Sequence, residues 1–179
     1  MKSTLRRNLG LMFVTLLVAD QVTKWLSVIY LPEQQPVQII PGIFSLTLIY
    51  NPGAAFGLFA SWSDLTRRSA LWIVSFVALL VVARFMFKDA KDDAISQYCL
   101  VAILSGAIGN IVDRIRLDRV IDFLDFYWKN YHSPAFNLAD SAISIGVTVL
   151  LIRMIFSPST LKTAPTENLA DKSTVDSST

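Results

Sequence analysis

The sequence has 179 residues, of which 53% are hydrophobic and only 17% carry a charged side chain. A soluble domain averages roughly 45–50% apolar and about 25% charged residues, and the mean hydropathy here is +0.49. This composition excludes a disordered chain, a fibrous protein and a secreted disulfide scaffold, and it favours a small membrane protein that crosses the bilayer several times. The 16 basic and 14 acidic residues give a formal net charge of +2, too balanced to indicate a nucleic-acid partner.

The first apolar stretch, residues 9–31, is long enough to cross a bilayer as a helix. It is interrupted by Asp20 and Lys24, and no small-residue cleavage site follows it, so we interpret it as a retained helix rather than a cleaved signal peptide. Three further apolar stretches are predicted to span the membrane, at about 69–87, 95–112 and 135–156. The expected fold class is therefore an all-α membrane protein with four transmembrane helices.

The connections between these spans are unequal in length, and the two long ones lie on the same side. In residues 32–68, the run GIFSLTLIY at 42–50 predicts a strand, Asn51-Pro52-Gly53 predicts a turn, and AAFGLF at 54–59 is too short to span but could dip into the interface. The other long connection is 113–134. We thus expect a small extracytoplasmic segment containing β-structure, one domain over residues 1–156, and a disordered cytoplasmic tail at 157–179.

Basic residues near the span ends indicate the orientation. One side of the predicted topology carries the N-terminal lysine and arginines, the basic residues between spans two and three, and those closing span four, and we take this side as cytoplasmic. The opposite side also carries positive charge, namely Arg67, Arg68, Arg114, Arg116, Arg119 and Lys129. Both termini are expected in the cytoplasm.

Polar residues inside membrane spans are costly and are functional candidates, and in this topology nearly all of them fall at one depth. Span three places Gly106, Asn110 and Asp113 on one helix face near its outer end, and span four places Asn137 and Asp140 likewise. The same depth is reached by residues from span one and from the two outer connections: Asp20, Lys24, Asn51, Gly53, Asp122 and Asp125. This convergence predicts a site toward the outer leaflet.

Several of these residues also have purely structural interpretations. The glycines of span three would allow close helix packing, Asp20 and Lys24 would form an ion pair one helical turn apart, and Asp113 could pair with its neighbour Arg114. Asn51 could simply shape its turn. Away from the site, Asp118 and Asp125 are expected to be solvated loop residues, His132 an interfacial surface residue, and Cys99 an apolar filler.

The inventory of reactive groups limits the chemistry to carboxylates. With one cysteine and one histidine, the chain can form neither an internal disulfide nor a cysteine cluster nor a His-Glu-x-x-His metal site, and it has no phosphate-binding loop. Asp122 and Asp140 could meet if the loop folds back over the start of span four; two close carboxylates share a proton and can serve as acid and base. The spacing permits this pairing without proving it.

Five motifs, in order, resemble the bacterial lipoprotein signal peptidases (signal peptidase II), a family of four-span intramembrane aspartic proteases. The motifs cover roughly residues 14–153: DQVTK from Asp20, NPGAAF from Asn51, GAIGNIVDR from Gly106, VIDFLDF from Val120 and FNLAD from Phe136. The family cleaves the signal peptide of prolipoproteins N-terminal to a cysteine that carries diacylglycerol. It is located in the bacterial inner membrane, needs no metal and no cofactor, and is inhibited by the cyclic peptide globomycin.

The resemblance implies a role for each matching residue. Asp122 and Asp140 would be the catalytic dyad, and Asn110, Arg114 and Asn137 would orient the dyad or the substrate backbone. Asn51 and Gly53 would lie in a loop that closes over substrate. Asp20, Lys24 and Asp113 would support the site, and Gly106 would belong to its small-residue helix face. The expected partners are prolipoproteins, membrane lipids and globomycin-type inhibitors, and the expected state is a monomer.

Two other functions remain open from the residues alone. A proton-coupled transporter could use Asp20, Asp113 and Asp140 as a relay, but the cytoplasmic half of the spans offers few polar groups for a path. A membrane scaffold without activity would leave the convergence of polar residues unexplained.

Overall fold

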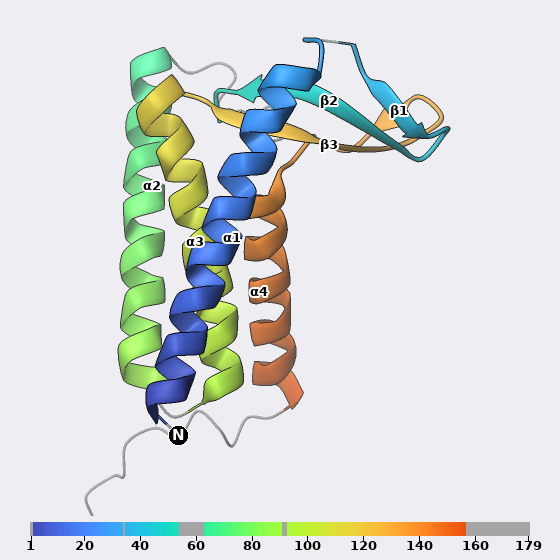
Figure 1. Ribbon diagram of the computed structural model, residues 1–179. Coiled ribbons are helices and arrows are strands. Elements are labelled where there is room, and N and C mark those ends of the chain that lie inside the picture. Colours follow the sequence, from blue (N-terminus) through green and yellow to red (C-terminus); the bar gives the residue numbers. More distant parts are fainter. Residues whose placement is uncertain (1, 34, 54–62, 91–92, 157–179) are drawn as a thin grey trace, which may run out of the picture.

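The computed structural model describes residues 2–33, 35–53, 63–90 and 93–156. Their backbone forms an upright bundle of four long helices with a small sheet across one end (Figure 1). All four helices are long and apolar enough to cross a membrane, which confirms the predicted class of helical membrane protein. In chain order they are α1 (Lys2–Tyr30), α2 (Asp64–Arg84), which continues into the π-helical turn η2 (Phe85–Asp89), α3 (Ala94–Leu117) and α4 (Leu138–Phe156).

The helices begin and end where local chemistry dictates rather than where the apolar runs do. Helix α1 begins at Lys2, several residues before the apolar run predicted to start at 9. Helix α3 continues to Leu117, past the predicted end at 112, and stops because Asp118 turns left-handed with φ 57°. Helix α4 begins at Leu138, because residues 135–137 are held against a strand and Asn137 caps the helix.

The sheet is built from the two long connections and is antiparallel in the order β1-β2-β3-β4. Strand β2 confirms the strand predicted over 42–50. No strand is predicted within the connection at 113–134, yet a strand of nine residues forms there. Acidic residues interrupt its apolar pattern and hide the signal. The strands are β1 (Val37–Ile40), β2 (Phe44–Asn51), β3 (Val120–Trp128) and β4 (Tyr131–His132).

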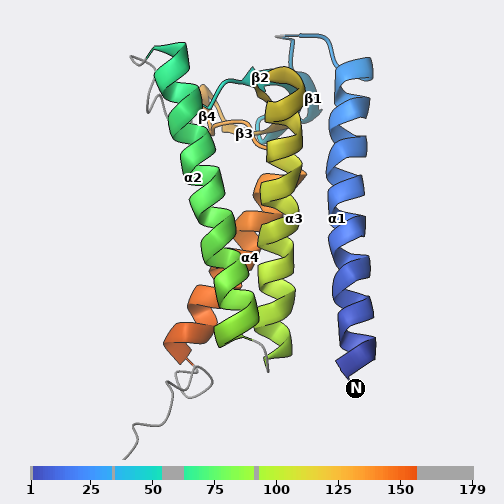
Figure 2. The same ribbon diagram turned by 90° about the vertical axis from the view of Figure 1, so that its left-hand side faces the viewer.

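Helix α3 lies at the centre of the bundle, with α1 and α2 on opposite sides of it and α4 packed along it (Figure 2). Half of the residues in the most apolar stretch of α3 are buried, whereas none of the residues in the corresponding stretch of α2 is buried. The large apolar side chains of α2, such as Ile73 and Phe76, are exposed on its outer surface, as expected for a helix that faces lipid.

Small residues allow α3 and α4 to approach closely, as the sequence predicted. A Cβ at Gly106 would collide with the backbone oxygen of Ala139, and one at Gly146 would come within 2.7 Å of the backbone oxygen of Cys99. The sheet lies at the end of the bundle opposite the start of α1 and the end of α4 (Figure 1). The predicted interfacial segment 54–59 and the predicted tail 157–179 lie outside the described residues.

Candidate active site

Asp122 is held on β3 with its carboxylate almost fully buried, at 2% exposure. Its Oδ1 accepts a hydrogen bond of 2.7 Å from Nδ2 of Asn137, and its Oδ2 accepts one of 2.9 Å from Nδ2 of Asn51. Pairing of β2 with β3 sets Ile49 opposite Asp122 and places Asn51 at the end of the same strand. The position of Asp122 therefore depends on a long-range strand pairing.

Asp140 lies in the first turn of α4. Its Oδ1 accepts a 2.7 Å hydrogen bond from Nδ2 of Asn110 on α3, and its Oδ2 accepts the backbone N–H of Asn137 at 3.3 Å. In return the backbone N–H of Asp140 donates to Oδ1 of Asn137 at 2.9 Å. This reciprocal cap fixes the start of the helix and the direction of the Asp140 carboxylate together.

Two asparagine amides connect the carboxylates. Asn137 is fully buried, and its Nδ2 lies 2.7 Å from the carboxylate of Asp122 and 3.2 Å from Oδ1 of Asn110. Asn110 in turn donates to Asp140. The two aspartates, from different elements, are thus the ends of one continuous chain of hydrogen bonds.

Both carboxylates line a single cavity of about 660 Å³ at the sheet end of the bundle. Its wall combines the polar groups of the site with apolar side chains such as Leu71 of α2 and Phe136, and Arg114 lines it as well. A cavity with an apolar wall and two carboxylates is suited to bind a largely apolar chain and to polarise a water molecule beside it.

Burial, opposed by the hydrogen bonds from Asn51 and Asn137 and assisted by the negative charge of Asp140, raises the pKa of the Asp122 carboxyl to about 7. The neutral acid therefore persists up to about neutral pH. This is the protonation state needed by a group that must donate a proton to a leaving amine.

A second buried cluster lies behind the cavity, where Nζ of Lys24 is 2.9 Å from Oδ2 of Asp20 and 2.9 Å from Oδ2 of Asp113. The predicted ion pair of Asp20 with Lys24 is confirmed. The predicted local pair of Asp113 with Arg114 is wrong: Asp113 is buried against Lys24, and its Oδ2 also accepts the backbone N–H of Ile121 at 3.2 Å. Neighbours along a helix project in different directions, so the two residues face different surroundings.

This cluster touches the site directly. Lys24 donates to Oδ1 of Asn110 at 3.0 Å, and Oδ1 of Asp20 accepts the backbone N–H of Ala139 at 2.8 Å. Gln21 was not singled out from the sequence, yet its side chain contacts Asp20, Asp113 and the backbone of α3. Its position next to Asp20, inside the polar run DQVTK of an otherwise apolar span, is the sequence feature that could have indicated its part in the cluster.

The turn predicted at Asn51-Pro52-Gly53 forms beside the cavity. The Gly53 backbone N–H donates to Oδ1 of Asn51 at 2.8 Å, while Nδ2 of the same amide reaches Asp122. Gly53 adopts φ +94°, which disfavours any residue with a Cβ, and a Cβ there would also collide with Leu71. Asn51 therefore shapes the turn and touches the carboxylate at once.

The expectation that Asp125 is a solvated loop residue is wrong. Asp125 is 5% exposed, and its Oδ2 accepts a 3.0 Å hydrogen bond from Ser45 and lies 2.8 Å from Nδ1 of His132. Strand pairing of β3 with β2 buries it, a contact that the local sequence could not reveal. Asp118 is exposed, as predicted, and forms a surface ion pair with Arg68. No group of three or more potential metal ligands occurs among the described residues.

The chain is similar to known proteins over most of its length. The model of a family described as Signal peptidase (SPase) II matches residues 12–156. The lipoprotein signal peptidase of Geobacter sulfurreducens is 48% identical over 139 residues, which are 78% of this chain and 86% of that protein. The lipoprotein signal peptidase of Desulforapulum autotrophicum is 42% identical over 150 residues, or 84% and 93%.

Solved structures share the fold. Two structures of a bacterial membrane enzyme, solved by the in meso method at 1.9 and 2.3 Å resolution, superpose with TM-scores of 0.73 and 0.75 at 28% sequence identity. They cover 84% and 89% of this chain, and 94% of each solved chain is matched. From the family match over most of the chain, and from relatives at this identity and coverage, it follows that the chain belongs to the signal peptidase II family of lipoprotein signal peptidases.

Proposed function

We propose that Asp122 and Asp140 are the catalytic dyad of this chain, which as a member of the signal peptidase II family is a membrane aspartic endopeptidase that removes signal peptides from prolipoproteins. The observation that carries the assignment is the chain of amide hydrogen bonds that joins the two carboxylates in one cavity. Cleavage occurs on the N-terminal side of the lipid-modified cysteine.

The environments of the two carboxylates support different roles. Asp140 lies in the first turn of α4, where the helix dipole and the backbone N–H of Asn137 favour a negative charge. Asp122, whose pKa is raised to about 7, keeps its proton up to about neutral pH and serves as the acid. In the proposed step, Asp140 takes a proton from water, the water oxygen bonds to the scissile carbonyl carbon, the C–N bond breaks, and the leaving nitrogen takes the proton of Asp122. Transfer of the proton from Asp140 to Asp122 restores the pair, which titrates as a unit.

The remaining cavity residues position the dyad and the substrate. Asn110 and Asn137 hold the carboxylates, Asn51 and Gly53 form the loop beside them, and Arg114 faces the cavity, where its guanidinium is available to the substrate backbone. The site is also held in place by the buried ion-pair cluster, whose members bind Asn110 and the backbone next to each dyad residue: Lys24, Asp20 and Asp113. Globomycin-type cyclic peptides would occupy the same cavity, and no second copy is needed to complete it, so a monomer suffices.

The topology fits a lipid-anchored substrate. The start of α1 and the end of α4 lie at one end of the bundle, and the sheet lies at the other (Figure 1). Asp122 is on strand β3 of this sheet, and Asp140 lines the same cavity. With the basic end in the cytoplasm of the inner membrane, the dyad lies toward the outer leaflet. A diacylglyceryl cysteine anchored in that leaflet holds its own scissile bond at this depth, so that the bond reaches the dyad without entering the hydrocarbon.

The test is cleavage of a diacylglyceryl-modified prolipoprotein by the purified full chain in detergent. Asp122→Asn and Asp140→Asn should each lower the cleavage rate per folded molecule by at least about 100-fold, the usual contribution of a general acid or base. Each should lower the stability by only about 1–3 kcal/mol, because the new amide group leaves one N–H donor of the site without its acceptor. Asp118→Asn is the matched control, because Asp118 is exposed and asparagine tolerates its left-handed backbone. Near-normal cleavage by either dyad variant would contradict the assignment.

A further inference from the structure

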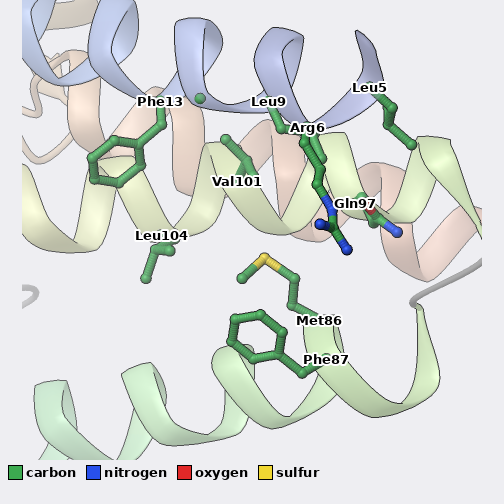
Figure 3. A pocket seen from close by; sticks show the side chains of 10 residues that line it. Leu5, Arg6, Leu9, Phe13, Met86, Phe87, Gln97, Val101 and Leu104 are labelled. Carbon is green, nitrogen blue, oxygen red and sulfur yellow. The ribbon is translucent and has the colours of Figure 1, made fainter. Parts of the chain in front are cut away.

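A second large cavity lies at the opposite end of the bundle from the dyad. It is a groove of about 620 Å³ between α1, the turn η2 and α3 (Figure 3). Apolar side chains from all three elements line it, among them Leu9, Phe13, Phe87 and Leu104. Among the described residues, none lines both the groove and the cavity of the dyad, so the peptidase reaction does not account for the groove.

The depth of the groove determines what can fill it. Helix α1 has 29 residues, about 43 Å of helix, whereas the hydrocarbon core of a bilayer is about 30 Å thick. The first turns of α1 therefore reach the headgroups, and Phe13 lies within the hydrocarbon. A Cβ at Gly10, which also lines the groove, would meet nothing within 4 Å, so the helix leaves open space there. At this depth the groove is surrounded by the hydrocarbon of the bilayer, so a lipid acyl chain is the molecule available to occupy it.

Arg6 gives the groove a charged end. Its guanidinium points into the gap between α1 and η2, near Met86 and Gln97 (Figure 3). Arg6 makes no ion pair with any residue that the structure describes. Basic pockets between membrane helices are typical sites for anionic lipid headgroups. A second copy in the same orientation would bring its own basic helix ends to this position, so the charge favours an anionic lipid over self-association.

We propose that this groove binds an anionic phospholipid, with one acyl chain lying between α1, η2 and α3 and the phosphate at the Arg6 guanidinium. The acyl chain fills the apolar length from Leu9 to Phe13, and the headgroup sits at the helix end. The site is independent of the dyad, so it can be tested without measuring proteolysis.

The experiment uses the purified full chain in phosphatidylcholine vesicles that contain a trace of spin-labelled phosphatidylglycerol or, for comparison, spin-labelled phosphatidylcholine. Electron paramagnetic resonance gives the fraction of labelled lipid immobilised on the protein. Arg6→Gln should lower the preference for phosphatidylglycerol about fivefold, the effect of one basic residue at an anionic lipid. Arg7→Gln is the matched control, since it removes the same charge at nearly the same depth from a residue outside the groove.

A second variant tests the apolar part. Gly10→Leu places a side chain in the open space and strengthens the helix, so it should fold normally and reduce immobilisation of both lipids. Equal effects of the Arg6 and Arg7 variants would show a general basic surface in place of a site. Unchanged immobilisation in the Gly10 variant would show that no acyl chain occupies the groove. Either result overturns the proposal, and circular dichroism confirms that each variant is folded.

Discussion

Replacing Lys24 with methionine should destabilise the protein more than any single change to its acidic partners. The Lys24 ammonium lies 2.9 Å from each of two carboxylates, Asp20 and Asp113, and 3.0 Å from Oδ1 of Asn110, with the charged side chains only 1–2% exposed. The cluster thus contains one positive and two negative groups. Methionine keeps most of the volume of lysine but leaves two buried anions without a counter-charge.

The magnitudes follow from this charge balance. Removing one partner of a buried ion pair costs about 3–5 kcal/mol, and Lys24→Met should reach that range. Asp20→Asn should cost only about 1–3 kcal/mol, the range for one disturbed buried hydrogen bond. It leaves a balanced pair of Lys24 and Asp113, and its amide oxygen can still accept the N–H of Ala139. The double variant should lose less free energy of unfolding than the two single variants lose together, because it leaves only one buried anion, Asp113, without a counter-charge.

The measurement is the free energy of unfolding in mixed micelles, combined with the cleavage rate per folded molecule. Asp20→Asn should retain cleavage at a temperature where it is folded, since Asp20 contacts neither dyad carboxylate in any described hydrogen bond. If Asp20→Asn destabilised the protein as much as Lys24→Met, the charge-balance argument would be refuted. Complete loss of cleavage by Asp20→Asn with unchanged stability would show a direct part in the chemistry.

Three further outcomes are expected. Because the raised pKa keeps Asp122 protonated only up to about 7, a pH profile of cleavage should decline as the pH rises above neutrality; a flat profile to pH 9 would contradict its role as acid. Gly106→Ala should destabilise the protein by about 1–3 kcal/mol through overpacking against α4, whereas Gly10→Ala should be at least as stable to heat as the wild type, since a Cβ there has open space and alanine favours the helix. Asp125→Ala should cost about 1–3 kcal/mol by leaving Ser45 without its partner; a stability equal to the wild type would show that Asp125 is dispensable.

Helical periodicity carried much of the prediction. The spacing of Gly106, Asn110 and Asp113 places them on one face of any helix, and in the structure that face does meet α1 and α4. The separation of Asp20 and Lys24 by one helical turn likewise predicted their ion pair. These predictions succeeded because the spacing of residues within one helix fixes which of them share a face.

Contacts between distant segments could not be predicted in this way. Asn51 and Asp122 are 71 residues apart, and their hydrogen bond depends on the register between β2 and β3. The burial of Asp125 and the choice of Lys24 as partner for Asp113 depend on the same kind of packing. From the local sequence, the acidic residues of β3 look like those of a solvated loop. Their burial becomes apparent only when the neighbouring strand β2 is placed beside them.

Asn137 shows how the two kinds of information combine in the site. Its reciprocal hydrogen bonds with Asp140, three residues later, are a local helix cap that the sequence alone permits. The same side chain then uses its Nδ2 to contact Asp122 on a different element. Because one buried side chain satisfies both requirements, the start of α4 cannot shift without moving the two carboxylates relative to each other. The rigidity of the proposed dyad is therefore a consequence of how the helix is capped.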